Sequence, residues 1–282
     1  MNPEQYSPVA PSSRVEKAPL VSIVTIVLNG NDLIRKTMDS VLCQTYTNIE
    51  YIVIDGGSAD GTQQLLQEYD SRLAFWSSEA DRGISDAFNK GVAKATGDIV
   101  GLLNAGDWYE PDAVEQVVEH FRLFPRTDVV CGMLQYWRGN KREYLCPSVP
   151  ELLEKEMTVT HPTCFLRAEL YRQSGGFSTD YRYAMDYELL LRLRLEGTRF
   201  WALKRVLANM QHEGVSEKNW NLALKETQRA RRELLPRSLY SSVCYYYFLY
   251  TKRALRRQAE KLGWEGVVRF YRQRIAVVKK TK

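Results

Sequence analysis

Two aspartates stand at positions where a parallel sheet would place chemistry. Asp107 follows the apolar run 98–103, and Asp55 follows the apolar run 49–54. In open α/β sheets, ligands bind at the carboxyl ends of the strands. A carboxylate at such an end can hold a divalent cation, and the cation can hold phosphates. The alternatives are that Asp107 caps the helix behind it and that Asp55 forms an Asx turn.

The loop after Asp55 begins with Gly56 and Gly57, which permit positive φ angles and a close approach of the backbone. Such a loop can admit a nucleotide base, with the carboxylate accepting a hydrogen bond from a ring N–H. The chain contains neither the GxGxxG dinucleotide fingerprint nor the GxxxxGK[ST] phosphate loop. The sequence therefore excludes these two common kinds of nucleotide site.

The elements that must position these residues alternate between strand and helix. Apolar, β-branched runs predict strands at 21–28, 49–54, 73–77 and 98–103. Apolar residues at helical spacing predict the intervening helices at 33–44, up to 69, at 84–95 and at 112–121. Four alternations with short links predict an α/β fold whose parallel sheet is covered by helices.

Beyond residue 121 the pattern changes. Two runs around a Gly-Asn turn, 129–137 and 142–146, predict an antiparallel hairpin that extends the sheet at one edge. Helices are expected at 168–174 and 186–196, and a further strand at 200–203. From Glu217 the chain becomes helical and basic, with breaks at Pro236 and Gly263.

Composition limits the class of protein. The 282 residues are 44% hydrophobic, enough for a large core, and carry a net charge of +5. Five cysteines without metal-ligand spacing fit a reducing compartment. The N-terminus lacks an apolar signal core, and the apolar-aromatic run 243–250 is far shorter than the roughly 20 residues that span a bilayer. We therefore expect a cytoplasmic protein.

Several short motifs, weak one by one, are specific in their order and spacing: 22–29, 40–46, 54–62, 81–84, 86–91, 95–98 and 103–109. With them, residues 21–121 resemble a family 2 glycosyltransferase of the GT-A fold. The resemblance continues more loosely at 161–165, 175–177, 186–192 and 212–216, covers about two-thirds of the chain and ends at Ser216. It implies a mostly parallel GT-A sheet flanked by helices, with a C-terminal helical extension.

The resemblance also implies a division of the chain. Residues 1–18 would be a flexible arm, and 19–216 the glycosyltransferase domain. Within that domain a donor half would cover 19–125 and an acceptor half 126–216. Residues 217–282 would form a basic, amphipathic helical extension.

Roles for individual residues follow from the resemblance. Asp107 would bind Mg²⁺ or Mn²⁺ on the donor diphosphate, Asp55 would contact the base, most often uracil, and Asp186 would be the catalytic base. Two positions depart from the family pattern, because the earlier acidic positions of the metal motif are Asn104 and Gly106. A single carboxylate still suits a cation that takes its other oxygens from phosphate and water.

A second departure is Met185, which stands where the family often has a Glu before the base.

Further candidates are assigned to three parts of the site: Gly57, Asp81, Asn89 and Asn104 to donor binding, His212 to the metal, and Trp108, Tyr109 and His161 to the acceptor. Each of these residues has a structural alternative, such as a helix cap, a structural His or core packing.

The function that the resemblance implies is transfer of a hexose or N-acetylhexosamine from a UDP-sugar to a saccharide, possibly lipid-linked, in polysaccharide biosynthesis. If the base and the leaving group lie on opposite faces of the sugar, a single displacement inverts the anomeric carbon. Two alternatives stay open. One is a sugar nucleotidyltransferase, and the other is a non-catalytic, membrane-associated protein that binds nucleotide sugars.

The tail has a chemistry of its own. Eleven Lys and Arg residues lie between 251 and 282, next to the aromatic run 245–250. Basic residues with interfacial aromatics suit a helix lying on an anionic membrane, which would make the protein peripheral on the inner face of the cytoplasmic membrane. No nucleic-acid motif accompanies the charge. The alternative is that these helices pack on the catalytic domain with a solvated charged face.

Overall fold

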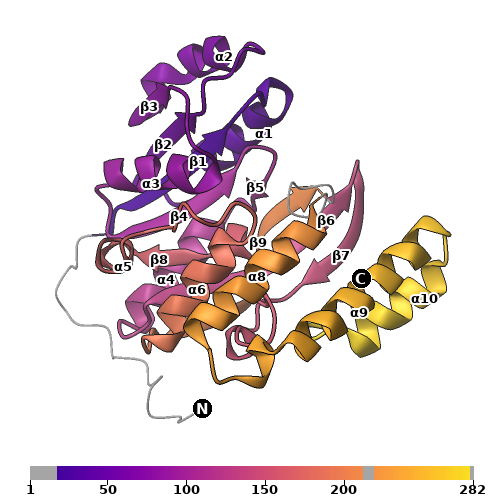
Figure 1. Ribbon diagram of the computed structural model, residues 1–282. Helices are drawn as coiled ribbons and strands as arrows, with labels where there is room; N and C mark the ends of the chain where they lie inside the picture. Colours follow the sequence, from indigo (N-terminus) through magenta and orange to yellow (C-terminus); the bar gives the residue numbers. More distant parts are fainter. Residues whose placement is uncertain (1–17, 212–218, 280–282) are drawn as a thin grey trace.

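A single curved sheet organises the computed structural model, which describes residues 18–211 and 219–279 (Figure 1). Within these ranges nine strands pair in the order β3-β2-β1-β4-β8-β6-β9-β5, and β7 pairs with β6 beside this row. The strands are β1 (Val21–Val27), β2 (Ile49–Asp55), β3 (Phe75–Ser78), β4 (Ile99–Asn104), β5 (Trp108–Tyr109), β6 (Val129–Arg138), β7 (Lys141–Cys146), β8 (Phe165–Arg167) and β9 (Phe200–Gln211). The predicted α/β class is confirmed, because β1 to β4 are mutually parallel.

Helices cover both faces of the sheet, as its doubly buried strands require. One hydrophobic cluster lies under α1 (Asn31–Leu42), α2 (Thr62–Tyr69) and α4 (Ala113–Leu123). The other lies under α3, α5, α6 and α8, whose bounds are Ile84–Lys94, Ala168–Ser174, Met185–Leu195 and Trp220–Leu234. Successive residues of β1 alternate between the clusters, since Ile23 joins the first and Val24 the second.

The prediction that the hairpin extends one edge of the sheet is wrong for its first strand. β6 lies inside the sheet, between β8 and β9, and only β7 stands outside the row. The reason is β9, which runs for 12 residues rather than the four predicted and pairs in parallel with β6. The exposed pair Lys204 and Arg205 interrupts its apolar pattern where the pairing shifts register, so the sequence conceals the second half of the strand.

The sheet is curled, so that β5 at the end of the strand order lies close to β4 in its middle. β4 and β5 are separated by only three residues of chain, yet β8, β6 and β9 lie between them in the strand order. β5 closes this path by pairing with β9, Trp108 opposite Asn209 and Tyr109 opposite Ala208. The turn 105–107 therefore stands where the two ends of a five-strand strip meet.

The C-terminal part follows the predicted helical pattern. After α8 come a short 3-10 turn, α9 (Val243–Lys261), α10 (Glu265–Phe270) and a π-helical turn at Tyr271–Ile275. α8 packs against α6, whereas α9 and α10 lie beside β7, at the other end of the molecule from α2 and β3 (Figure 1). No helix of residues 18–211 and 219–279 is long and apolar enough to cross a membrane.

Candidate active site

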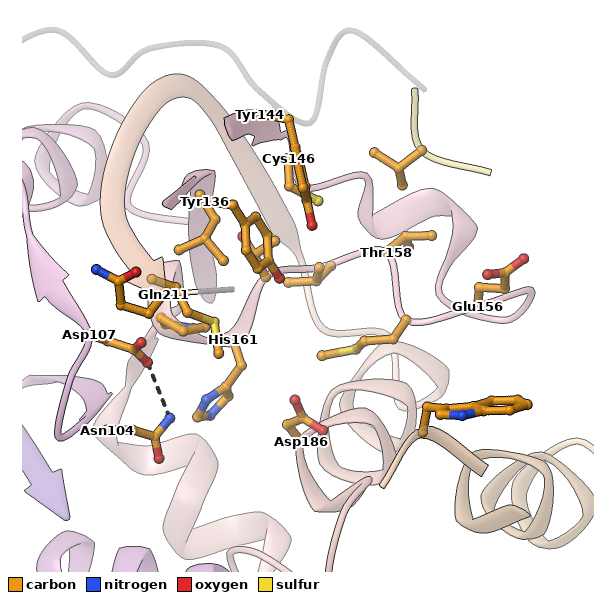
Figure 2. A pocket seen from close by; sticks show the side chains of 18 of the residues that line it. Asn104, Asp107, Tyr136, Tyr144, Cys146, Glu156, Thr158, His161, Asp186 and Gln211 are labelled. Atoms are coloured by element: carbon orange, nitrogen blue, oxygen red, sulfur yellow. Dashed lines mark hydrogen bonds between the residues drawn. The ribbon is translucent and has the colours of Figure 1, made fainter. Parts of the chain in front are cut away.

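The turn that closes the strip opens into a cavity of about 710 Å³. Most of its lining comes from the turn 104–107, the β6–β7 hairpin, the segment 156–162, the start of α6 and the chain beyond 219, with smaller contributions from α1, α3 and the end of β9. In Figure 2, His161 and Asp186 lie between the Asn104–Asp107 pair on one side and Glu156 on the other. The cavity thus joins carboxylates from both predicted halves of the domain.

The backbone of the turn explains how Asp107 reaches the cavity. Gly106 has a φ of +98°, a conformation that residues with a side chain rarely adopt, so an acidic residue at this position would be strained. The buried hydroxyl of Thr37 on α1 accepts a hydrogen bond from the Gly106 N–H at 2.9 Å and donates one to the Asp107 carbonyl at 2.7 Å. Helix α1 therefore fixes the turn from below.

Asp107 is 5% exposed, so its carboxyl group is buried. Among the described residues, its carboxylate accepts one long hydrogen bond, 3.4 Å from the Asn104 amide nitrogen. Burial raises the pKa of Asp107 to about 7, against which the Asn104 bond is a small opposing effect. A divalent cation at this carboxylate would supply the missing positive charge.

Asp186 occupies the first turn of α6 and faces the same cavity. Its Oδ1 accepts a hydrogen bond from the Tyr187 N–H at 2.7 Å. Burial raises its pKa above the ordinary value, and the neighbouring His161 opposes this shift. A carboxylate whose pKa is raised toward neutrality is a stronger base than an exposed one.

A carboxylate from α8 holds the loop in front of Asp186. Glu226 accepts hydrogen bonds from the backbone N–H groups of Arg182, Tyr183 and Ala184, at 2.7 to 3.1 Å. These groups precede α6, so Glu226 satisfies donors that the start of the helix leaves without partners. The domain boundary predicted at 216 falls among residues outside the described chain, and α8 beyond it holds the loop that precedes α6.

His161 lies at the centre of the cavity. Its ring contacts Phe88 and Phe177 edge-on, with centroids 5.7 and 5.8 Å apart. Burial lowers the pKa of His161, and the Asp186 charge works against this shift. The ring is therefore neutral at pH 7, with a face for packing and nitrogen atoms for a hydrogen bond.

Of the predicted donor residues, Asn104 and Asp107 line the cavity, whereas Asp55, Gly57, Asp81 and Asn89 lie outside its described lining. Asp55 is fully buried at the end of β2. Its carboxylate accepts from the backbone and hydroxyl of Ser58 and from the hydroxyl of Ser78. Asp81 accepts from the Gly83 N–H at 2.7 Å. Both carboxylates thus stabilise their own loops, as the turn alternatives anticipated.

Gly57 and Asn89 also have a structural part to play. Gly57 turns the loop with a φ of +85°. Asn89 donates to the Phe177 carbonyl at 2.8 Å and accepts from the Phe177 N–H at 2.9 Å. It ties α3 to the segment before α6, so its amide groups are used within the protein.

The aromatic pair predicted for the acceptor site separates. Tyr109 is 3% exposed and packs on Phe165 in the core, with ring centroids 5.4 Å apart. Trp108 points to the other side of β5, where it is half-buried near Trp137 and below the Lys36 ammonium. The alternation of side chains along a strand explains why neighbouring aromatics face opposite ways.

A metal site with several protein ligands is not found among the described residues, since no three His, Cys, Asp or Glu side chains gather there. His212, the second metal candidate, lies outside the described residues. Asp107 and the Asn104 amide fit a cation that takes its remaining oxygens from a diphosphate and water, because the carboxylate is buried without a countercharge.

The sequence analysis missed the polar face of α1. Thr37, Ser40 and Gln44 lie on one side of the helix and its end, at spacings of three and four residues. Ser40 accepts from the Tyr109 N–H, and Gln44 donates to the Glu110 carbonyl. Ser40 and Gln44 fall within the motif 40–46, and polar residues at helical spacing are the signal that could have revealed this role.

Comparison with known proteins agrees with this architecture. The glycosyl transferase family 2 model matches residues 22–182, more than half of the chain. A glycosyltransferase of Mycobacterium tuberculosis (strain H37Rv) is 35% identical over 187 residues, covering 63% of this chain and 70% of the relative. The putative glycosyltransferase EpsE of Bacillus subtilis is 27% identical over 242 residues, covering 80% and 87%.

Solved structures share the fold. Staphylococcus aureus TarS 1–349, in complex with UDP-GlcNAc, superimposes with a TM-score of 0.63 at 16% identity, over 76% of this chain and 65% of that one. Mannosyltransferase PcManGT from Pyrobaculum calidifontis, in complex with GDP-Man and Mn²⁺, gives a TM-score of 0.61 at 20% identity, over 87% and 76%. The expected GT-A fold is confirmed. The protein belongs to glycosyl transferase family 2.

Proposed function

We propose that this glycosyltransferase moves a hexose or N-acetylhexosamine from a UDP-sugar to a saccharide acceptor and inverts the anomeric carbon. The observation that carries the proposal is the shared cavity of Asp107 and Asp186. Asp107 stands on the turn after β4 and Asp186 at the start of α6. A donor diphosphate at Asp107 and an acceptor hydroxyl at Asp186 would therefore meet in one space.

Asp186 is the proposed general base. Its carboxylate takes the proton from the acceptor hydroxyl, which makes the oxygen a better nucleophile at the anomeric carbon. The raised pKa favours this proton transfer, and a positioned base of this kind contributes roughly 10²–10⁴-fold in rate. Glu226 holds the preceding loop, and the buried walls around Met185 and His161 exclude water from the carboxylate.

Asp107 and Asn104 are the proposed ligands of Mg²⁺ or Mn²⁺. A bound cation neutralises the negative charge that develops on the leaving diphosphate. Asp107 must be ionised to bind it, and its pKa of about 7 makes cation binding weaker below neutral pH. Thr37 keeps the carboxylate in place through the backbone of the turn.

The nucleobase contact proposed for Asp55 needs a local rearrangement. UDP and UDP-GlcNAc are bound by TarS, which shares this fold and supports uracil as the base. Here the Asp55 carboxylate is occupied by Ser58 and Ser78, so a uracil N–H would have to displace one of these hydroxyls. An S78A variant removes one competitor and should bind UDP at least as tightly as the parent protein.

The reaction itself can be tested with a panel of nucleotide sugars. The protein is incubated with each donor and a mixed saccharide acceptor, and the nucleotide product is identified by chromatography. Glycosyl transfer releases UDP, and proton NMR of the glycoside reports the anomeric configuration. Release of pyrophosphate would instead indicate nucleotidyl transfer, and retention of configuration would contradict a single displacement at Asp186.

We also propose that the outer side of the C-terminal helices lies on an anionic membrane. Leu262, Trp264 and Phe270 are 55 to 58% exposed, and Arg269 and Arg274 are exposed beside them. Exposed aromatics insert at the membrane interface, and each nearby basic residue contributes about 1 kcal/mol on an anionic surface. Tyr247, Phe248 and Tyr250, which belong to the aromatic run 245–250, are 60, 56 and 38% exposed on α9.

Liposome flotation over a salt series tests this association. Because Leu249 is fully buried, deleting the helices would also open the core, so point variants are the better probe. W264S/F270S should reduce flotation with phosphatidylglycerol vesicles at every salt concentration. R269Q/R274Q should reduce it mainly at low salt, where screening is weak. Failure of the parent protein to float at low salt would contradict the proposal.

A further inference from the structure

The cavity has a second charged wall that the reaction described above does not use. Four arginines line it: Arg253, Arg256 and Arg257 on α9, and Arg272 on the turn after α10. The first three are spaced by three and four residues, so they lie on one face of α9. The basic tail therefore turns one face toward the active-site cavity and another toward the outside.

Contacts with the catalytic domain fix this face inward. Lys252, beside Arg253, forms an ion pair with Glu156 at 2.5 Å, and both side chains are nearly buried. The Tyr245 hydroxyl donates to the Lys155 carbonyl at 3.2 Å. At the other end, the Arg272 guanidinium lies 4.3 Å from the centre of the Tyr144 ring on β7. Three contacts from separate positions thus hold the arginine wall against the cavity.

The arginines are half-buried, and two of them lie near acidic side chains. The side chains of Arg256 and Arg272 are 18% and 17% exposed. Their ion pairs with Glu260 and Glu143 are 3.5 to 3.9 Å long, beyond normal hydrogen-bond distance. Partly desolvated guanidinium groups in such an arrangement can still turn N–H donors toward a ligand, and they bind phosphate oxygens in pairs.

The position of the wall indicates which substrate it serves. It adjoins Glu156 through Lys252, and Figure 2 shows Glu156 across the cavity from Asn104 and Asp107, with Asp186 between them. The donor diphosphate belongs at Asp107 under the proposed function. An anion at the arginine wall would therefore lie on the acceptor side of the base.

We infer that the arginine wall binds a phosphate or diphosphate group of the acceptor. This inference rests on the proposed function, because it takes Asp186 to mark the acceptor end of the cavity. A neutral saccharide offers guanidinium groups only uncharged hydroxyl acceptors, and a single carboxylate carries only one charge, whereas a phosphate group combines more charge with several acceptor oxygens. The group would belong either to a lipid-linked saccharide diphosphate or to a phosphate-bearing glycan.

Titration calorimetry with three probes tests the site on the full-length protein. Pyrophosphate, geranyl diphosphate and gluconate are titrated with UDP present, in EDTA so that no cation at Asp107 holds the probe. The parent protein should bind pyrophosphate, and gluconate at least tenfold more weakly. Tighter binding of geranyl diphosphate would assign the group to a lipid-linked acceptor, and equal binding would assign it to a phosphate-bearing glycan.

Matched variants locate the binding. R256Q/R272Q should weaken pyrophosphate binding at least tenfold, and R269Q/R274Q, which removes the same charge from the exposed side, should change it less than twofold. R253Q/R257Q is the second inner variant, in case loss of the Arg272 packing on Tyr144 unfolds the first. A thermal melt confirms that each variant is folded.

Three results would overturn the inference. They are absence of pyrophosphate binding by the parent protein, equal losses in the inner and outer variants, and weakened UDP binding in the inner variants, which would assign the arginines to the donor. UDP affinity is measured separately, with Mn²⁺ in place of EDTA. Failure of the parent protein to bind UDP would contradict the proposed function, whereas loss of pyrophosphate binding alone would contradict only the arginine wall.

Discussion

The two ends of the molecule use their polar side chains in different ways. Around β2 and α3, Asp55, Asp81 and Asn89 are hydrogen-bonded to neighbouring loops and lie outside the cavity lining. Around α6 and α9, Asp186 and the arginines of the wall face the cavity. The first end is stabilised by the same groups that are predicted to bind the donor. The second end depends on contacts between distant segments.

This difference between the two ends indicates which of them can determine specificity for the acceptor. Polar groups that hold their own loops can recognise a ligand common to many relatives, because the loop and the site are one local motif. Charged groups that face a cavity from different segments can change without disturbing a loop. We therefore expect donor binding to be sensitive to folding at the first end, and acceptor selection to be separable from folding at the second.

The largest effect is expected at the base. D186N keeps the shape of the side chain and removes its basicity, so the transfer rate should fall by about 10²–10⁴-fold. UDP affinity, measured by calorimetry, should stay within a few-fold, since the proposed donor contacts are Asp55 and Asp107 rather than Asp186. D180N, at an exposed position in the loop before α6, is the control. Substantial transfer by D186N would place the base elsewhere.

At Asp107, function and stability should respond in opposite directions. D107N, or EDTA with the parent protein, should lower transfer by orders of magnitude. The raised pKa of about 7, against an ordinary 3.8, means that the folded state favours the neutral acid. Folding is therefore penalised progressively as pH rises above 3.8, and the penalty is complete above about 7. D107N should therefore stabilise the metal-free protein at pH 8, by on the order of 3–4 kcal/mol.

The stability gain should shrink as pH falls and disappear below the ordinary pKa near 3.8, where the Asp107 carboxyl is neutral in both the folded and unfolded states. Chemical unfolding in EDTA at pH 8, 6 and 4 measures the trend. Full activity of the parent protein in EDTA would rule out the cation, and a D107N protein that is less stable at pH 8 would contradict the uncharged setting of the carboxyl.

A smaller effect is expected at Glu226, which supports the base without touching substrate. E226Q should lower kcat about three- to tenfold and leave the KM for the donor unchanged, because a neutral amide accepts more weakly from the three backbone N–H groups. Its negative charge also raises the pKa of Asp186. The acid limb of the kcat profile should therefore move to lower pH. E233Q on the same helix should not move that limb.

The smallest effect on activity is expected at Thr37. T37V removes the hydroxyl that joins the Gly106 N–H to the Asp107 carbonyl, so it should destabilise the protein by about 1–3 kcal/mol and raise the cation concentration needed for half-maximal activity. T37S keeps the hydroxyl and should restore both properties. If T37V and T37S behave alike, the hydroxyl does not position the turn.

Local patterns made the first half of the fold predictable. Apolar runs at β1, β2 and β4 indicated parallel strands, with Asp55 at the end of β2 and Asp107 in the turn after β4. The second half depended on pairings that leave little local trace. β9 was cut short at Lys204, and the place of β6 inside the sheet followed from that strand.

The candidate site divides in the same way. Asp186, Asp107, Asn104 and His161 reach one cavity, as the motifs suggested. Tyr109 lies in the core rather than at the acceptor site, because side chains alternate along β5 and the curled sheet covers the side on which Tyr109 points. The sequence analysis assigned the four arginines of the wall to the membrane-facing charge. Sequence spacing shows which residues share a face of a helix, but it does not show whether that face packs on the domain or is exposed.

The pairing of β5 with β9 has a consequence for the order of folding during synthesis. A partly buried hydrogen bond from the Asn209 amide to the Glu110 carboxylate joins residues 99 positions apart, at 2.7 Å. β1 to β4 can pair as soon as the chain reaches residue 104, but the turn that carries Asp107 cannot be enclosed until β9 has emerged. Such long-range contacts form late. The Glu110 N–H donates to the Leu207 carbonyl of β9, so its protection reports this pairing. We expect chains stalled before residue 200 to protect β1 and β2 from hydrogen exchange while Glu110 still exchanges freely. The enzyme would then enclose the Asp107 carboxylate only near the end of translation.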